Sequence, residues 1–260
     1  SKKFHIMPRA NRYFLHGNIW HITHRCHKKD FLLSLRRDRI RWLHWLYEAK
    51  KRYGGSILNY MVTCNHIHLL VMDNSVESSI SKLMQLVQSR TAQEYNIRKD
   101  RKGAFWEDRY HATAIDSEDY LIRCMTYINM NMVRAGVVKH PAEWSESGYS
   151  EIAFPKKRYR LIDISALMKE LHLNSLEELQ IKQNDYIKEA IDNKLFERQS
   201  KWTESIAVGS EEFVEKIKNQ LDIKAKSRKI MQYENDYILS ESEIPYKVIF
   251  NPKNEPLRSK

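Results

Sequence analysis

Residues 59–72 read NYMVTCNHIHLLVM, and this stretch decides the fold that we predict. Two apolar runs, at residues 57–63 and 66–72, lie on either side of a short polar break. Runs of this kind, separated by a tight turn, are typical of two adjacent strands. Because side chains alternate between the faces of a strand, His66 and His68 share one face and the isoleucine between them points to the other.

Two imidazoles side by side on an otherwise apolar strand can hold a divalent metal ion. The pattern by itself leaves a second interpretation open, because a His-x-His pair on a strand is often two polar residues on a solvated face. The remainder of the sequence is needed to choose between the two.

The elements around these strands follow from hydrophobic periodicity. Upstream we predict a strand at residues 19–24 and a helix at 32–53, and downstream a helix at 76–96, a strand at 111–115 and a helix at 117–134 with its serine N-cap at the first position. This order predicts an α+β fold, with a ferredoxin-like or RRM-like antiparallel sheet of four to five strands and two helices on one face. The other face of the sheet is expected to be free for a ligand.

The composition changes near residue 150, where a basic stretch at residues 154–160 follows. Beyond it we predict helices at residues 162–171, 176–193 and 211–221, the last two with Ser175 and Ser210 as N-caps. We therefore divide the chain into a first domain, residues 1–150, and a mostly helical C-terminal region, residues 151–260. This region either assists in DNA binding or only braces the first domain. Its polar end, residues 251–260, is expected to be mobile.

Charge and composition narrow the class of protein. The chain has 260 residues with 44 Lys and Arg against 33 Asp and Glu, a net charge of +11. This excess favours a polyanionic partner, nucleic acid before membrane. No apolar run approaches the roughly 18–20 residues of a membrane span, and the N-terminus lacks the apolar stretch of a signal peptide. The three widely spaced cysteines, Cys26, Cys64 and Cys124, fit a reducing cytoplasm better than a disulfide scaffold.

A second candidate cluster lies on the helix predicted at residues 117–134. Tyr127 and Asn131 are one turn apart on the same face. For an arbitrary Tyr–Asn pair, a half-buried phenol and a surface amide would be the ordinary interpretation. Beside His66 and His68, however, the amide oxygen completes a three-ligand metal site with open positions, which can polarise a substrate phosphate. A tyrosine within reach can attack that phosphate and form a covalent phosphotyrosine.

These residues resemble a known family. The His-x-His strand, the segment YINMNMVRAG at residues 127–136 and the segment GAFWEDRY at residues 103–110 are similar to motifs of the HUH single-strand transposases with one catalytic tyrosine, above all their REP-associated tyrosine transposase branch. Residues 202–214 are similar to a stretch that follows the catalytic domain in some members. The sequence departs from the family at Met132 and at Cys64, where Pro is often found.

The resemblance implies a role for each candidate residue. His66, His68 and Asn131 match the family's metal ligands, and Tyr127 matches its nucleophile. The implied activity is metal-dependent cleavage and strand transfer of single-stranded DNA next to a palindromic hairpin, through a 5′-phosphotyrosine and a free 3′-OH. Imidazoles alone favour zinc, copper or nickel, whereas oxygen ligands suit magnesium or manganese. The resemblance implies Mg²⁺ or Mn²⁺.

The resemblance also implies a cytoplasmic, nucleoid-associated bacterial protein that works as a monomer or a homodimer. Given the net charge of +11, we expect a set of basic and aromatic side chains to contact DNA. They are Arg25, Arg36, Arg37, Arg101, Lys102, Trp106, Arg109, Arg123 and Arg134. The alternative for the charged residues is simple solvation, and for Trp106 it is packing on the core.

Other interpretations are open. Tyr120 is a rival nucleophile, although no ligand residue follows it at the next turn. A dense cluster at residues 21–27, with three histidines and Cys26, could bind zinc. A replication initiator or a relaxase would use the same chemistry. A non-cleaving RNA- or DNA-binding protein on an RRM-like sheet would need aromatic residues on its open face in place of paired histidines.

Overall fold

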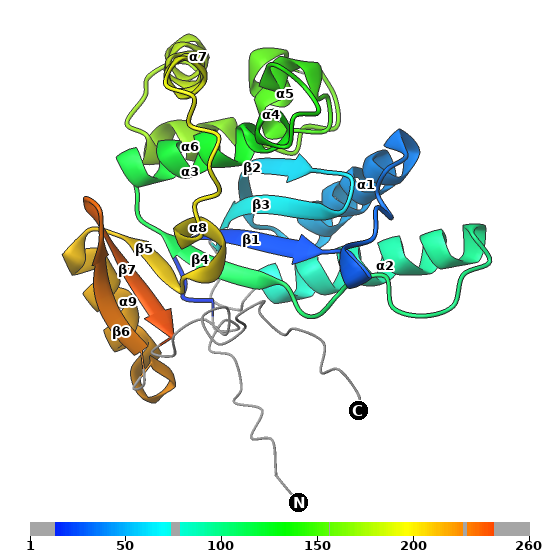
Figure 1. Cartoon of the computed structure of the whole chain (residues 1–260), viewed down its shortest axis with the longest axis horizontal. Coiled ribbons are helices and arrows are strands. Elements are labelled where there is room, and N and C mark those ends of the chain that lie inside the picture. The colour runs from blue at the N-terminus through cyan, green and yellow to red at the C-terminus, as the bar shows by residue number, and fades with distance from the viewer. Residues whose placement is uncertain (1–13, 74–78, 156, 226–227, 242–260) are drawn as a thin grey trace, which may run out of the picture.

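The computed structural model describes residues 14–73, 79–155, 157–225 and 228–241. Within these ranges the chain forms an α+β fold around one mixed sheet of seven strands, in the order β2-β3-β1-β4-β5-β7-β6 (Figure 1). The predicted fold class is confirmed. In the same ranges no helix combines the length and the apolar character that a membrane span requires. The polar end that we expect to be mobile lies outside the described residues.

Four strands from the first half of the chain form one side of the sheet: β1 (Ile19–Arg25), β2 (Ser56–Val62), β3 (His66–Met72) and β4 (His111–Ile115). Each neighbouring pair among them is antiparallel, as predicted. β3 lies between β2 and β1, with Thr23 opposite His68. The His-x-His pair therefore lies inside the sheet and not on a free edge.

The two predicted helices of the first half lie together on one face. α1 (Arg36–Tyr53) and α2 (Ser79–Arg98) pack against each other. The start of α2 lies beside Val71, with Gly55 between them. Ile67, between the two histidines, points to the same face as Val71 and is fully buried. This face of the sheet forms the main core.

A third helix lies on the opposite face. On α3 (Asp119–Asn129) the apolar side chains of Leu121, Met125 and Ile128 are fully buried. Asn59 of β2 donates a hydrogen bond to Asn129 Oδ1, at 3.1 Å, which fastens α3 to this side of the sheet. The expectation of a free face is therefore wrong, because α3 covers part of it and leaves a cavity beside the histidines.

The helix that contains Tyr127 differs from the prediction at both ends. It begins two residues after Ser117, which is not its N-cap. Asp116 organises this corner instead, accepting hydrogen bonds from the backbone N–H of Ser117 and from Ser210 in the C-terminal region. After α3 the chain continues as the short α4 (Asn131–Arg134) and stops at Gly136, whose φ of +69° suits glycine.

The C-terminal region contains helices where they are predicted, together with two short ones. They are α5 (Gly148–Ala153), α6 (Ile164–Glu170), α7 (Leu176–Asp192), α8 (Lys201–Glu204) and α9 (Glu211–Leu221). Ser175 Oγ accepts the N–H of Glu178 at 3.1 Å and Ser210 Oγ accepts the N–H of Phe213 at 3.2 Å. Both predicted N-caps are confirmed.

The same region adds three strands that we did not predict from the sequence. β5 (Ala207–Gly209) pairs in parallel with β4, and β7 (Asp236–Glu241) and β6 (Arg228–Tyr233) extend the sheet beyond it. β5 is three residues long, too short for a period of two to be visible, and β6 is a mostly exposed edge strand. The division at residue 150 stays a prediction, although one sheet contains strands from both sides of it (Figure 1).

Candidate active site

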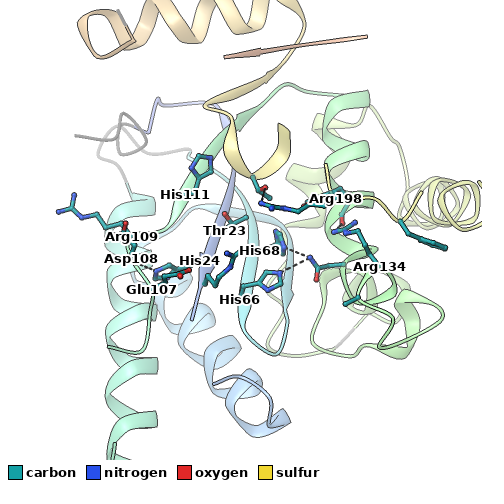
Figure 2. Close-up of a pocket in the computed structure, with 16 residues that line it drawn as sticks. Thr23, His24, His66, His68, Glu107, Asp108, Arg109, His111, Arg134 and Arg198 are labelled. Carbon is teal, nitrogen blue, oxygen red and sulfur yellow. Dashed lines mark hydrogen bonds between the residues drawn. The ribbon is translucent and has the colours of Figure 1, made fainter. Parts of the chain in front are cut away.

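His66 and His68 project from β3 toward α4, on the face that α3 covers (Figure 2). Their ring centroids are 5.0 Å apart. The Nε2 atoms of both rings face one side chain, Asn131, the first residue of α4. Asn131 Nδ2 lies 3.3 Å from His66 Nε2 and 3.0 Å from His68 Nε2. Three side chains from two distant motifs therefore converge on one point.

The amide of Asn131 can face this point with either of its ends. As placed, Nδ2 donates to the lone pairs of the two Nε2 atoms. A half-turn of the amide puts Oδ1 in the same position. Two imidazole nitrogens and one amide oxygen would then face a common centre, and this donor set leaves open positions for substrate. The residues present therefore fit the divalent ion that the sequence resemblance implies.

A third histidine, His21, forms a hydrogen bond with the ring nitrogen of His68 that faces away from Asn131. His21 Nδ1 lies 2.7 Å from the main-chain oxygen of Trp202, and His21 Nε2 lies 2.8 Å from His68 Nδ1. A carbonyl oxygen only accepts hydrogen bonds, so His21 has its proton on Nδ1 and its Nε2 accepts the N–H of His68. His68 Nε2 is consequently a lone pair directed at Asn131, as a metal-binding histidine requires.

The turn before β3 holds His66 in the same way. His66 Nδ1 lies 2.7 Å from Asn65 Oδ1 and 2.9 Å from Thr63 Oγ1. Thr63 Oγ1 also donates to the main-chain oxygen of His66, at 2.8 Å. With Nδ1–H donated to the turn, His66 Nε2 is a second lone pair at the site. The tight turn predicted from the sequence thus also sets the tautomer of a candidate ligand.

Burial keeps these imidazoles neutral. It lowers the pKa of His66 to about 4 and the pKa of His21 to about 3. It also lowers the pKa of His68 well below the ordinary value. The positive charges of Arg25 and Arg134 lower the pKa of His66 further. At neutral pH the rings therefore offer unprotonated nitrogens, the form that binds a metal ion.

Tyr127 lies on α3, one turn before Asn131, and is 7% exposed. Its ring centroid is 6.1 Å from that of His68, and Arg134 Cζ lies 4.2 Å from the centre of the phenol ring. Burial raises the pKa of the phenol, and the charges of Arg134 and Arg198 act against this rise. The two guanidinium groups therefore favour the phenolate, which is the nucleophilic form of a tyrosine.

The rival tyrosine lies elsewhere. Tyr120 is half-buried, with Arg123 Cζ 5.4 Å from its ring centre. It does not line the cavity that contains the histidines. The fold therefore brings Tyr127, and not Tyr120, to His66 and His68.

The histidines and Tyr127 line an open cavity of ≈ 790 Å³. Four arginines line it too, from β1, from the loop before β4, from α4 and from the C-terminal region: Arg25, Arg109, Arg134 and Arg198. Glu107 and Asp108 lie on the side away from Arg134 and Arg198 (Figure 2). One guanidinium group can donate two parallel hydrogen bonds to two oxygens of a phosphate. The side of the cavity that contains Arg134 and Arg198 therefore suits a phosphodiester.

Three of the nine side chains predicted to contact DNA line this cavity, namely Arg25, Arg109 and Arg134. Others are engaged in the fold. Arg36 pairs with Glu146 at 2.9 Å, and Arg123 pairs with Asp236 at 2.7 Å. Arg101 donates to main-chain oxygens of its own loop.

The remaining predicted DNA contacts lie outside the cavity. Trp106 stacks on His24, with ring centroids 4.3 Å apart, and donates to the main-chain oxygen of Gln88 at 3.2 Å. It packs on the core in this structure. Arg37 and Lys102 are exposed. Contact between DNA and these residues stays a prediction.

The histidine and cysteine cluster of residues 21–27 is not one site. Side chains alternate along β1, so His21 contacts His68, whereas His24 points to the other face of the strand, where its Nε2 lies 2.6 Å from the main-chain oxygen of Asp108 at the rim of the cavity. Among the residues that the structure describes, no group of three or more His, Cys, Asp or Glu is placed to hold a metal ion. The zinc interpretation of this cluster is therefore wrong.

The sequence did not reveal the part of the site that comes from the C-terminal region. Phe196, Arg198 and Thr203 line the cavity, and the carbonyl of Trp202 holds His21. Phe196 and Arg198 lie in an irregular segment and Trp202 and Thr203 in the four-residue α8, and neither is long enough or regular enough to show a periodic pattern. His21 did have a signal, because a period of two places it on the same face of β1 as the cavity-lining arginine of that strand.

One family model matches the part of the chain that contains the candidate site. Residues 15–131 match the model of a family described as IS200-like transposases. The matched segment contains all four residues of the candidate site, His66, His68, Tyr127 and Asn131. Over this segment the chain is similar to the IS200-like transposases.

Two solved structures are similar to parts of the chain. One is a REP-associated tyrosine transposase bound to a REP hairpin, with 19% identity, 59% of this chain and 90% of that chain covered, and a TM-score of 0.45. The other comes from Deinococcus radiodurans and is described as a transposase, with 12% identity, 39% of this chain and 81% of that chain covered, and a TM-score of 0.32. No curated protein matches the chain.

Proposed function

We propose that this protein is a metal-dependent tyrosine nuclease and strand transferase of the REP-associated branch, which cleaves single-stranded DNA next to a hairpin. The observation that supports this most is the convergence of His66 Nε2 and His68 Nε2 on Asn131, with the Tyr127 ring 6.1 Å from the His68 ring. The family match over the same residues supports DNA as the substrate.

The proposed site has one part that binds a cation and one part that binds the phosphate. His66, His68 and Asn131 would hold a Mg²⁺ or Mn²⁺ ion, which supplies Lewis-acid polarisation of a phosphate oxygen when bound. Arg134 and Arg198 line the same cavity and would bind other oxygens of that phosphate. The hydrogen bonds to Nδ1 of each ring keep the two lone pairs in position before substrate arrives.

In this proposal Tyr127 attacks the scissile phosphorus. The phenol gives up its proton as its oxygen bonds to phosphorus, and the bond from phosphorus to the 3′-oxygen breaks. That oxygen takes up a proton and leaves as a 3′-OH, while the 5′ side stays on Tyr127. The phosphotyrosine preserves the energy of the broken bond, so no ATP is required. The 3′-OH of a second strand can attack it and reverse the step, which transfers the strand.

The hairpin in this proposal comes from the sequence resemblance, and the charge of the chain agrees with it. The net charge is +11, and Arg25 and Arg109 line the cavity in addition to the two arginines near Tyr127. Binding should therefore weaken as salt rises, with a slope of about −0.7 in log K against log salt for each neutralised phosphate of a single strand.

A denaturing gel tests the chemistry directly. The full chain is incubated with labelled hairpin-containing single-stranded DNA and Mn²⁺, and a covalent adduct appears as labelled DNA at the mass of the protein. We expect Tyr127→Phe to remove the adduct and to retain DNA binding in fluorescence anisotropy. Tyr120→Phe, on the same helix, is the matched control and should keep the adduct.

Two results would contradict the proposal. An adduct that persists in Tyr127→Phe and disappears in Tyr120→Phe would transfer the nucleophile to the other tyrosine. DNA binding by the wild type without any adduct in Mn²⁺ or Mg²⁺ would favour a non-cleaving DNA-binding protein instead.

A further inference from the structure

A second cavity shares a wall with the first. Its volume is ≈ 750 Å³, within the range of small-ligand sites in proteins. It is lined by α3 and α4, by α7, by residues 194–199 between α7 and α8, and by the turn between β6 and β7. Most of this lining lies beyond residue 131, where the family match ends. The cavity is therefore largely a feature of the C-terminal region of this chain.

Three side chains line both cavities, namely Tyr127, Arg134 and Arg198. They form the partition between the two spaces, with the guanidinium of Arg134 over the Tyr127 ring at 4.2 Å. A DNA strand with its scissile phosphate at Tyr127 in the first cavity has the second cavity directly beside it. The two arginines lie where a phosphate that links the two occupants would pass.

The charges of the second cavity distinguish it from a simple phosphate site. Its lining includes five cations, namely Arg123, Arg134, Lys194, Arg198 and Lys201, of which Arg123 and Lys201 are bound to Asp236. It also includes three carboxylates, those of Glu189, Glu197 and Glu234, the last of them 3.7 Å from Lys201 Nζ. Carboxylates repel phosphate but accept hydrogen bonds from the amino groups of adenine, cytosine and guanine. Thymine has no exocyclic amino group, and its one base donor, N3–H, lies between two carbonyl oxygens that a carboxylate repels.

Two tyrosines give the cavity flat apolar surfaces. Tyr186 of α7 is half-buried, and Tyr233 at the end of β6 is 37% exposed. Aromatic side chains of this kind stack the bases of single strands. The cavity thus offers a partner for each part of a nucleotide: aromatic rings for the base, carboxylates for its amino group and cations for the phosphate.

A buried ion-pair network holds the second cavity in shape. Asp236 of β7 is 1% exposed and accepts hydrogen bonds from both terminal nitrogens of Arg123, at 2.9 and 2.7 Å, and from Lys201 Nζ at 2.8 Å. Arg123 comes from α3, so the network connects the helix of Tyr127 to the β6–β7 hairpin. A site preorganised in this way loses little freedom when a ligand binds.

We propose that the second cavity binds one nucleotide of the single strand adjacent to the scissile phosphate and selects a base that has an exocyclic amino group. The inference rests on the proposed function, because that function places the phosphate at Tyr127. Tyr186 and Tyr233 provide the stacking surfaces, and Glu189, Glu197 and Glu234 provide the acceptors for the amino group.

Selection from a random pool tests the proposal. The probe is single-stranded DNA with one fixed hairpin flanked on both sides by random nucleotides, and the protein is the full chain with Tyr127→Phe, so that bound DNA stays uncut. Bound molecules are recovered and sequenced. We expect thymine to be depleted at one flanking position. Adding Glu189→Gln, Glu197→Gln and Glu234→Gln together should abolish this depletion, because a glutamine amide also donates to thymine carbonyls.

The matched control carries Glu177→Gln and Glu215→Gln, two exposed helix positions outside both cavities. It should keep the preference. Circular dichroism checks that each variant is folded. As a second measurement, Tyr233→Ala should weaken binding of the selected sequence by about 5- to 150-fold, the range for the loss of one stacked base.

The outcomes separate this inference from the proposed function. Covalent adduct formation by the protein with Tyr127 intact, together with a base preference that survives the triple glutamate change, overturns the inference and leaves the proposed function standing. A preference that is lost in the triple variant, with no adduct from the wild type, supports the nucleotide site and overturns the cleavage proposal. If the protein with its three glutamates intact selects a pool in which thymine is not depleted at any flanking position, the inference is overturned.

Discussion

His21 Nε2 lies 2.8 Å from His68 Nδ1, and this contact connects a candidate metal ligand to the C-terminal region of the chain. The other nitrogen of His21 is bound to the carbonyl of Trp202 in α8. His21 is fully buried and does not line the cavity, so it acts through His68. It is a positioning residue that selects the tautomer and the orientation of the ligand.

Removal of His21 should therefore weaken metal binding. We expect His21→Ala to lower the affinity for Mn²⁺ by about 10- to 100-fold, the usual cost of losing a hydrogen-bond partner of a ligand. His21→Gln offers an oxygen that can still accept the N–H of His68, so it should retain more of the affinity. Titration calorimetry with Mn²⁺ measures both. His44→Ala, at an exposed position of α1, is the control. Equal affinities in all three variants would contradict the positioning role.

The buried His24 should make stability depend on pH. Burial lowers its pKa from 6.5 to about 4, so the unfolded chain binds its proton near pH 6.5 and the folded protein only near pH 4. Between these values the unfolded state holds more protons, and the free energy of unfolding falls as the pH falls. One such histidine contributes about 1.4 kcal/mol per pH unit.

His24→Gln should remove this contribution. Urea unfolding at several pH values between 6 and 4.5 should then give a free energy of unfolding that depends less steeply on pH than in the wild type. A variant with the wild-type slope would show that His24 is not protonated on unfolding in this range.

Arg134 should affect both the rate and the pH profile of adduct formation. It lines the cavity beside Tyr127, and its charge lowers the pKa of the phenol against the effect of burial. Arg134→Gln should slow single-turnover adduct formation on the order of 10²-fold, as for the loss of one preorganised charge donor. It should also move the rise of the rate to higher pH, because the phenol becomes harder to ionise. Arg37→Gln, exposed on α1 and outside the cavity, should change neither.

Asp236 should be essential for stability. It is buried and bound by Arg123 and Lys201, and Lys201 is only 3% exposed. Asp236→Ala leaves the buried ammonium of Lys201 with only the exposed carboxylate of Glu234, 3.7 Å away, which should cost about 3–5 kcal/mol in the free energy of unfolding. Replacing Lys201 and Asp236 together with Met and Leu should cost less, because no unpaired charge stays behind.

An exposed ion pair provides the comparison for this prediction. Arg198 and Glu204 are 2.7 Å apart, with side chains 51% and 54% exposed. Breaking this pair with Glu204→Ala should change the free energy of unfolding by about 1 kcal/mol or less. Urea unfolding measures all the variants, and a cost at Asp236 no larger than at Glu204 would contradict the role of the buried network.

The candidate site could be predicted from the sequence where a local period or motif marks it. His66 and His68 follow from the period of a strand, and Tyr127 and Asn131 from the turn of a helix, and the structure brings all four together. Arg198 could not be found in this way, because it comes from an irregular segment that the tertiary fold carries to the cavity.

The strands of the C-terminal region were missed for a physical reason. β5 is stabilised by pairing with β4 and not by a pattern of its own. Arg123 shows the same limit: its place on the helix suggested a DNA contact, but the ion pair with Asp236 depends on a residue 113 positions later. When the two residues of an ion pair are this far apart in the chain, neither spacing nor composition predicts the pair.

The main-chain oxygen of Trp202 accepts a hydrogen bond from His21, so the position of α8 in the C-terminal region affects the candidate ligand His68 in the first half of the chain. Substitutions that move α8 would change the orientation of His68, so the two parts of the chain should accumulate compensating substitutions. An exchange of domains between relatives would succeed only if the junction kept the α8 segment with its matching β1.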